Sequence, residues 1–280
     1  MTSILRGTLA ALAFTSTVWL TATAAVADDF ETCARASGDQ AMAACTRAIN
    51  SDRYDGRHLA DLLNNLCVEW NEKRESDTAI EHCSEAIRLN PDHEDAFNNR
   101  GIAYNDKGQY DRAIEDYNQA IRLSPNYAMA FYDRGIAYKN KNQHDRAIED
   151  YNQAIRLDPN YAKAFTNRGS EYYGKGQYDR AIEDYNQAIR LNSSDAIAFN
   201  NRGSAYKSKG QYDRALLDYD QAIRLNSSDA FAFYNRGVLW ERKNDLQRAL
   251  ADFKKFSELA PSDPDGPKAV ERVTKALSGR

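Results

Sequence analysis

Apolar and polar positions along this 280-residue chain follow the period of amphipathic α-helices. In the stretch 94–127, Phe97, Gly101 and Tyr104 lie at i, i+4 and i+7, which places them on one face of a helix. The same spacing recurs further along the stretch, at Ala113, Tyr117, Ala120 and Leu123. The pattern therefore predicts two amphipathic helices joined by a short turn.

This two-helix pattern recurs every 34 residues. The glycine of the first helix returns in five consecutive copies, at Gly101, Gly135, Gly169, Gly203 and Gly237. A helix pair of this length cannot bury its apolar face alone, so neighbouring copies must stack on one another. The sequence thus predicts an all-α fold built from tandem helix hairpins.

The repeats resemble the tetratricopeptide repeat (TPR). The resemblance rests on the pattern Phe97…Gly101…Tyr104…Ala113…Tyr117…Ala120…Pro125. It implies a right-handed α-solenoid whose first helices line a concave groove. Full units are expected at 60–93, 94–127, 128–161, 162–195, 196–229 and 230–263. We also expect a degenerate hairpin and linker at 28–59 and a C-terminal capping helix at 264–280.

The segment 1–27 follows a different pattern. Arg6 precedes an apolar run at 9–20, and Ala25 and Ala27 form a small-x-small cleavage site. This layout is typical of a secretory signal peptide. The alternative, an uncleaved membrane anchor, is disfavoured because the run is short and contains threonine and serine. We therefore expect an exported protein of bacterial type, periplasmic or secreted, without stable membrane insertion.

All four cysteines precede the most regular repeats. Cys67 and Cys83 lie at equal distances from the expected turn of their hairpin, as do Cys33 and Cys45 in the preceding one. Facing positions in an exported protein predict two disulfides, each within one hairpin. The alternatives are a zinc site, whose ligands usually come in closer pairs, free buried thiols, or a Cys45–Cys67 link between hairpins.

Charge and composition argue against several functions. The net charge is −4, and charges of both signs are mixed along every repeat, so no basic stripe is available for nucleic acid. The four histidines form no arrangement with a nucleophile and an orienting group. We therefore expect no catalytic residues, no metal and no cofactor.

A column of arginines on the first helices faces a column of aspartates on the second helices. The arginines are Arg100, Arg134, Arg168, Arg202 and Arg236, and the aspartates are Asp116, Asp150, Asp184, Asp218 and Asp252. In unit 60–93 both charges are lost together, at Leu66 and His82. We predict an ion pair within each repeat; the alternative is an anion-binding column.

A second column consists mainly of amides, at Asn65, Asn99, Asp133, Asn167, Asn201 and Asn235. Asn99 lies about 200° around the helix from Phe97, which directs this column toward the groove. A carboxamide can donate and accept at once, so a row of them can hold an extended peptide. The resemblance adds that some superhelical TPR proteins use such a ladder, although asparagine can also recur without a binding role.

The expected partner is therefore a protein or extended peptide. The alternative is glycan binding, or docking in polysaccharide export or envelope assembly, with Tyr127, Tyr161 and Tyr173 expected to be exposed.

We predict that the exported chain begins at Asp28, because signal peptidase cleaves after small residues. N-terminal sequencing and intact mass of the exported protein check this. A soluble exported form that retains Met1 would contradict the prediction.

Overall fold

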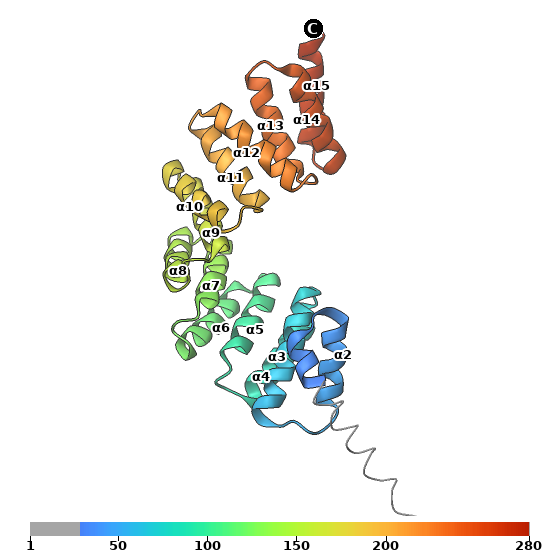
Figure 1. Cartoon of the computed structure of the whole chain (residues 1–280), viewed down its shortest axis with the longest axis vertical. Helices are drawn as coiled ribbons and strands as arrows, with labels where there is room; N and C mark the ends of the chain where they lie inside the picture. The colour runs from blue at the N-terminus through green and yellow to red at the C-terminus, as the bar shows by residue number, and fades with distance from the viewer. Residues whose placement is uncertain (1–28, 280) are drawn as a thin grey trace, which may run out of the picture. The chain divides into compact units, whose positions relative to one another are not determined.

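The computed structural model describes residues 29–279 (Figure 1). Every helix or strand assigned in these residues is an α-helix, which confirms the predicted all-α class. The chain divides into two compact parts, each containing several repeats. They are called unit 1, which ends at Asn126, and unit 2, which begins at Tyr127. The expected signal peptide lies outside the described residues.

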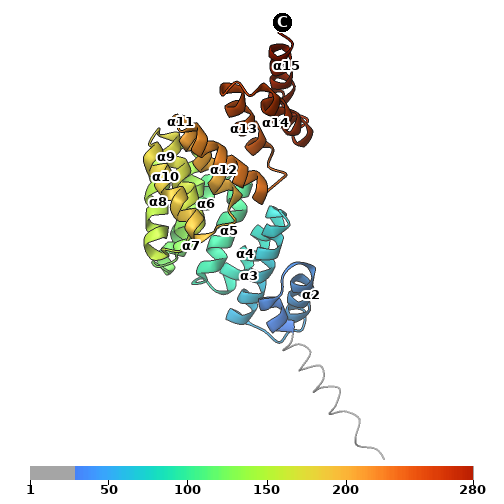
Figure 2. The ribbon, with the colours of Figure 1, turned by 45° about the horizontal axis from the view of Figure 1, so that its top comes forward.

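Unit 1 contains a short α-helix at residues 29–35 and then stacked antiparallel helices (Figures 1 and 2). Consecutive helices contact each other, and α3 also contacts α5, the first helix of the next hairpin. The helices are α2 (Gly38–Ile49), α3 (Gly56–Glu72), α4 (Ser76–Leu89), α5 (Glu94–Asp106) and α6 (Tyr110–Leu123).

Unit 2 repeats the same arrangement in four hairpins and one further helix. Each first helix packs on its own second helix, α9, α11 and α13 also pack on the second helix of the preceding hairpin, and α15 packs on α14. The helices are α7 (Ala128–Asn140), α8 (His144–Leu157), α9 (Ala162–Gly174), α10 (Tyr178–Leu191), α11 (Ala196–Ser208), α12 (Tyr212–Leu225), α13 (Ala230–Arg242), α14 (Leu246–Leu259) and α15 (Asp265–Leu277). None of the described helices is both long and apolar enough to cross a membrane.

The glycine column allows the two helices of a hairpin to approach closely. A Cβ atom added to Gly101 would lie 2.6 Å from Cε1 of Tyr117, and one added to Gly135 would lie 2.7 Å from Cε1 of Tyr151. Real Cβ atoms are essentially never that close to another heavy atom. The absence of a side chain at these positions is therefore what allows the two helices to lie this close.

The arginine and aspartate columns form the predicted ion pairs. In each of the five repeats, Nε and Nη2 of the arginine donate to the two carboxylate oxygens of the aspartate, over 2.6–2.9 Å. Within unit 2, Nη1 of Arg202 also donates to Asn186 of the preceding repeat (2.7 Å). Because Nε and Nη2 of each arginine bind the aspartate of the same repeat, the ion pair is favoured over the anion-binding alternative.

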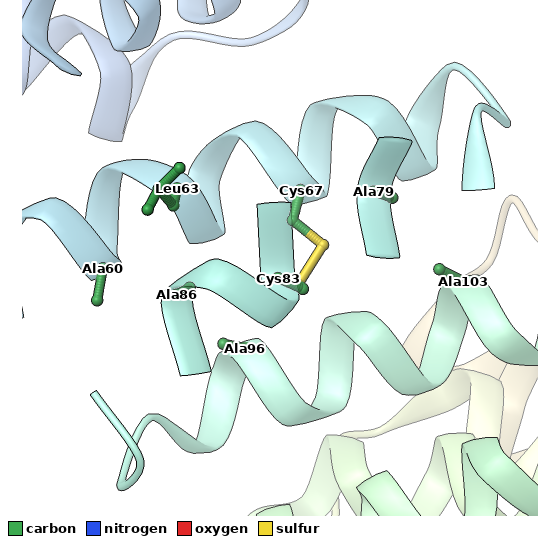
Figure 3. Packing of buried hydrophobic residues seen from close by; sticks show 8 residues of the cluster. All are labelled: Ala60, Leu63, Cys67, Ala79, Cys83, Ala86, Ala96 and Ala103. Carbon is green, nitrogen blue, oxygen red and sulfur yellow. A yellow bond between two sulfur atoms is a disulfide. The ribbon is translucent and has the colours of Figure 1, made fainter. Parts of the chain in front are cut away.

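Two disulfides lie in unit 1. The bond between Cys67 and Cys83 joins α3 to α4, with the Cα atoms 5.5 Å apart, and Ala96 and Ala103 of α5 face the same cluster (Figure 3). Cys33 and Cys45 form the other bond, with the Cα atoms 4.7 Å apart. These are the two pairings expected from positions equidistant from a turn.

The ion pair between Arg202 and Asp218 should be strongly coupled. Only 7% of the Asp218 side chain is exposed, so removing either partner strands a buried charge. We expect Arg202→Ala and Asp218→Ala each to lower the free energy of unfolding by about 2–4 kcal/mol, and the double variant to lose less than the sum. Urea denaturation measures this, with the exposed Arg190→Ala as control. Strictly additive losses would contradict the coupling.

The disulfides can be tested by peptide mapping without reduction, which should recover Cys33 linked to Cys45 and Cys67 linked to Cys83. Replacing Cys67 and Cys83 by alanine should lower stability by about 3 kcal/mol, because the cross-link restricts the unfolded chain. The double variant Cys67→Gly/Cys83→Tyr should lose less, since it installs the glycine–tyrosine contact of the later repeats. A peptide linking Cys45 to Cys67 would contradict the pairing.

Candidate binding surface

The six positions of the amide column lie on the first helices of their repeats. Unit 1 holds Asn65 in α3 and Asn99 in α5. Unit 2 holds the longer run, in α7, α9, α11 and α13, at Asp133, Asn167, Asn201 and Asn235. All six side chains are partly exposed.

The amide nitrogens do not point freely into solvent. They donate to side chains of the preceding repeat in the same unit, and these bonds connect neighbouring first helices. Nδ2 of Asn99 donates to Oδ1 of Asn64 (2.9 Å), and Nδ2 of Asn167 donates to the hydroxyl of Tyr132 (3.0 Å). Nδ2 of Asn201 donates to Oγ of Ser170 (3.3 Å), and Nδ2 of Asn235 donates to Oδ1 of Asn200 (3.2 Å). In Asn65 the acceptor is the weaker Sγ of Cys33 (3.7 Å).

These bonds fix which part of each amide faces outward. The side-chain oxygens of Asn167 and Asn201 have no hydrogen-bond partner within the described residues, whereas Oδ1 of Asn235 accepts from Nζ of Lys207 (3.1 Å). Burial raises the pKa of the Tyr132 hydroxyl, which accepts from Asn167, to about 12. The surface therefore offers oriented acceptors, not the paired donors and acceptors expected from sequence.

Apolar side chains accompany the amides on the same helical face. Ile197 and Phe231 lie four residues before Asn201 and Asn235, and are therefore one turn away along the same face. They are 63% and 59% exposed, among the most exposed large hydrophobic side chains in the described residues. Exposed side chains of this size on adjacent first helices are suited to an apolar contact with a partner.

The tyrosines expected to be exposed are only partly exposed, so that expectation is wrong. The ring of Tyr161 packs against Tyr132, with the centroids 4.8 Å apart. The ring of Tyr173 packs against Tyr178 at 5.5 Å. These rings are used in packing between side chains and are poor platforms for a sugar ring.

Sequence reasoning missed a histidine–carboxylate pair in unit 2. Nδ1 of His144 lies 2.7 Å from Oε2 of Glu171, and only 6% of Glu171 is exposed. Both residues line a cavity of about 540 Å³ beside Ser170. The signal was present, because His144 replaces the tyrosine and Glu171 the alanine of most other repeats.

This cavity does not assemble a nucleophile. The hydroxyl of Ser170 donates to the backbone oxygen of Thr166 (3.0 Å) and accepts from Asn201 (3.3 Å), so its hydrogen bonds lie within the scaffold. In the described residues no group of three or more histidine, cysteine, aspartate or glutamate side chains is placed to hold a metal ion.

Comparison with protein families identifies the repeats. The model described as "TPR repeat" matches residues 102–141, 169–210 and 203–244, and models described as "Tetratricopeptide repeat" match 128–161, 82–115 and 150–183. Together they cover residues 82–244 without a gap, which is more than half of the chain. The chain therefore belongs to the tetratricopeptide repeat family. None of the curated proteins matches the sequence.

Several solved structures are similar to the chain. MamA is 28% identical, with a TM-score of 0.53, over 58% of this chain and 95% of MamA. YrrB, described as "a TPR protein with an unusual peptide-binding site", is 24% identical, with a TM-score of 0.55, over 68% of this chain and 97% of YrrB. Pseudomonas aeruginosa PilF is 17% identical, with a TM-score of 0.69, over 79% of this chain and 100% of PilF. The latter two similarities show the fold alone.

Proposed function

We propose that the chain is a non-catalytic scaffold that binds a protein or an extended peptide on the first helices of unit 2. The observation that carries the proposal is the pair of amide oxygens at Asn167 and Asn201. Their amide nitrogens are held by the preceding repeat, while the oxygens have no partner within the described residues. An extended backbone supplies N–H donors at regular intervals and would complement such acceptors.

The bonds to the preceding repeat favour binding for a second reason. Ordering a side chain on association costs free energy, and a side chain that is already held in the free protein avoids part of this cost. The exposed Ile197 and Phe231 add apolar area to the same face. The peptide-binding site described for YrrB is consistent with this use of the fold, but the proposal rests on the residues of this chain.

We further propose that this scaffold acts outside the cytoplasm, in the periplasm or as a secreted protein. Its support is the spacing of Ala25 and Ala27 before Asp28, together with the two disulfides of unit 1. A glycan partner is the weaker alternative, because the rings of Tyr161 and Tyr173 are packed against other tyrosines.

Selection from a bead-displayed library of random twelve-residue peptides tests the proposal. We expect the mature wild-type protein to retain peptides, and the double variant Asn167→Ala/Asn201→Ala to bind the selected peptides about 1–3 kcal/mol more weakly, because each amide contributes about 0.5–1.5 kcal/mol. Circular dichroism should show unchanged helical content.

Tyr132→Phe is the matched control. It removes the acceptor for the Asn167 nitrogen, and so loses the same inter-repeat hydrogen bond, but it leaves the amide in place. Its stability should fall by about 1 kcal/mol, as in Asn167→Ala, while its peptide affinity should stay within a few-fold of the wild type. If Tyr132→Phe loses as much peptide affinity as Asn167→Ala, the amide supports the scaffold and does not contact the ligand.

A further inference from the structure

Lysines at the turns of unit 2 are paired with carboxylates. Nζ of Lys175 donates to Oδ1 of Asp145 in the preceding repeat (2.6 Å), and Lys243 contacts Asp213 in the same way (2.7 Å). Between these two repeats, Lys209 and Asp179 form the equivalent pair. The charge at this edge of the unit is therefore neutralised within the chain.

Lysines on the first helices behave differently. No carboxylate in the described residues forms an ion pair with Lys139 of α7, Lys163 of α9 or Lys207 of α11. Lys207 is partly buried, and within residues 29–279 its one hydrogen-bond partner is the neutral oxygen of Asn235 (3.1 Å). Burial lowers the pKa of its ammonium group, with no nearby carboxylate to offset the effect. A desolvated cation without a counter-charge gains strongly from an anionic partner.

The acidic side chains on the first helices of unit 2 do not compensate these lysines. The carboxylate of Glu171 accepts from His144, and that of Glu241 accepts from Arg272 of α15 (2.7 Å). Asp133 lies in α7, where its charge adds to burial in raising the pKa of Tyr161. Lys163 and Lys207 therefore carry positive charges that no ion pair within the described residues neutralises.

We infer that the first-helix face of unit 2 binds an extended acidic segment of a protein, in which carboxylates flank an apolar residue. This inference rests on the proposed function and specifies its partner. Lys163 and Lys207 supply the charge, and Ile197 and Phe231 supply the exposed apolar contact. Lys163, Ile197 and Phe231 occupy equivalent positions in three consecutive repeats, so a single extended chain that crosses the first helices meets them in order.

The expected ligand also has a spacing. Packed helices lie about 8–10 Å apart, and an extended chain advances about 3.3 Å per residue. Side chains that engage consecutive repeats should therefore be about three residues apart. A segment with an apolar residue at every third position and glutamates between them fits both the charge and the spacing.

Fluorescence anisotropy with three labelled twelve-residue peptides tests the inference. All three have leucine at every third position; the remaining positions alternate serine with glutamate, glutamine or lysine. We expect the glutamate peptide to bind the mature protein at least tenfold more tightly than the glutamine peptide, and the lysine peptide to bind most weakly. Raising the salt concentration should reduce this preference, because screening weakens exposed charge pairs.

Variants assign the preference to particular lysines. Lys163→Gln and Lys207→Gln should each weaken binding of the glutamate peptide about five- to tenfold and leave the glutamine peptide nearly unchanged; glutamine retains a donor for Asn235. Lys254→Gln removes an equal charge from an exposed position on the second helix α14, and should change neither affinity.

The outcomes separate this inference from the proposed function. Equal binding of the glutamate and glutamine peptides, in a protein that does retain library peptides, would overturn the acidic preference and leave peptide binding intact. No peptide binding by the wild type in either experiment would overturn both. A single-stranded oligonucleotide that binds more tightly than the glutamate peptide, with the same dependence on Lys163 and Lys207, would overturn the inference in favour of a nucleic-acid surface.

Discussion

The contact between a glycine in each first helix and an aromatic ring in its second helix sets the distance on which the rest of each repeat depends. The ring leaves no room for a side chain at the glycine, as the 2.6 Å between an added Cβ at Gly101 and Tyr117 shows. The arginine lies one residue before the glycine, and the aspartate lies one residue before the aromatic residue. At this helix separation the arginine donates to both carboxylate oxygens of the aspartate. In the hairpin of α3 and α4, the disulfide of Cys67 and Cys83 occupies the same pair of positions. A disulfide in one repeat and a glycine–aromatic contact in the others thus hold the two helices together at the same place.

Because these interactions use the facing sides of the two helices, the opposite side of each first helix is available for other contacts. That side is ordered before any ligand arrives. The amide of Asn167 is held by Tyr132, and that of Asn201 by Ser170, so each repeat positions the side chain of the next. Disturbing one repeat should therefore affect binding at its neighbour as well as stability. This coupling follows from nearest-neighbour stacking in repeat proteins.

The sequence predicted those features in which both partners recur. Arginine and aspartate columns at equal distances from a turn must face each other in a helix hairpin, and the cysteine positions follow the same rule. The hydrogen-bond acceptors of the amide nitrogens could not be predicted in this way. Their acceptors lie in the preceding repeat and belong to different residue types, such as Asn64, Tyr132 and Ser170. Asn64 and Tyr132 share a column of mixed composition, and Ser170 lies four residues beyond the corresponding position of its repeat, so the acceptors carry no common periodic signal.

The exposure of Tyr161 was predicted wrongly for a related reason. Its ring packs against Tyr132. The repeat 128–161 is the one repeat of the sequence with a tyrosine both at the position of Tyr132 and at the end of the repeat. Residues that recur in every repeat build the scaffold, and their charges are neutralised by partners that recur with them. Some residues differ from those at the same position in the other repeats; examples are Lys163, Phe231, His144 and Glu171. These residues have no interaction partner that recurs with the repeat. Selectivity for a ligand must therefore arise where the repeats differ, because a surface made of identical repeats would bind every register of an extended chain equally.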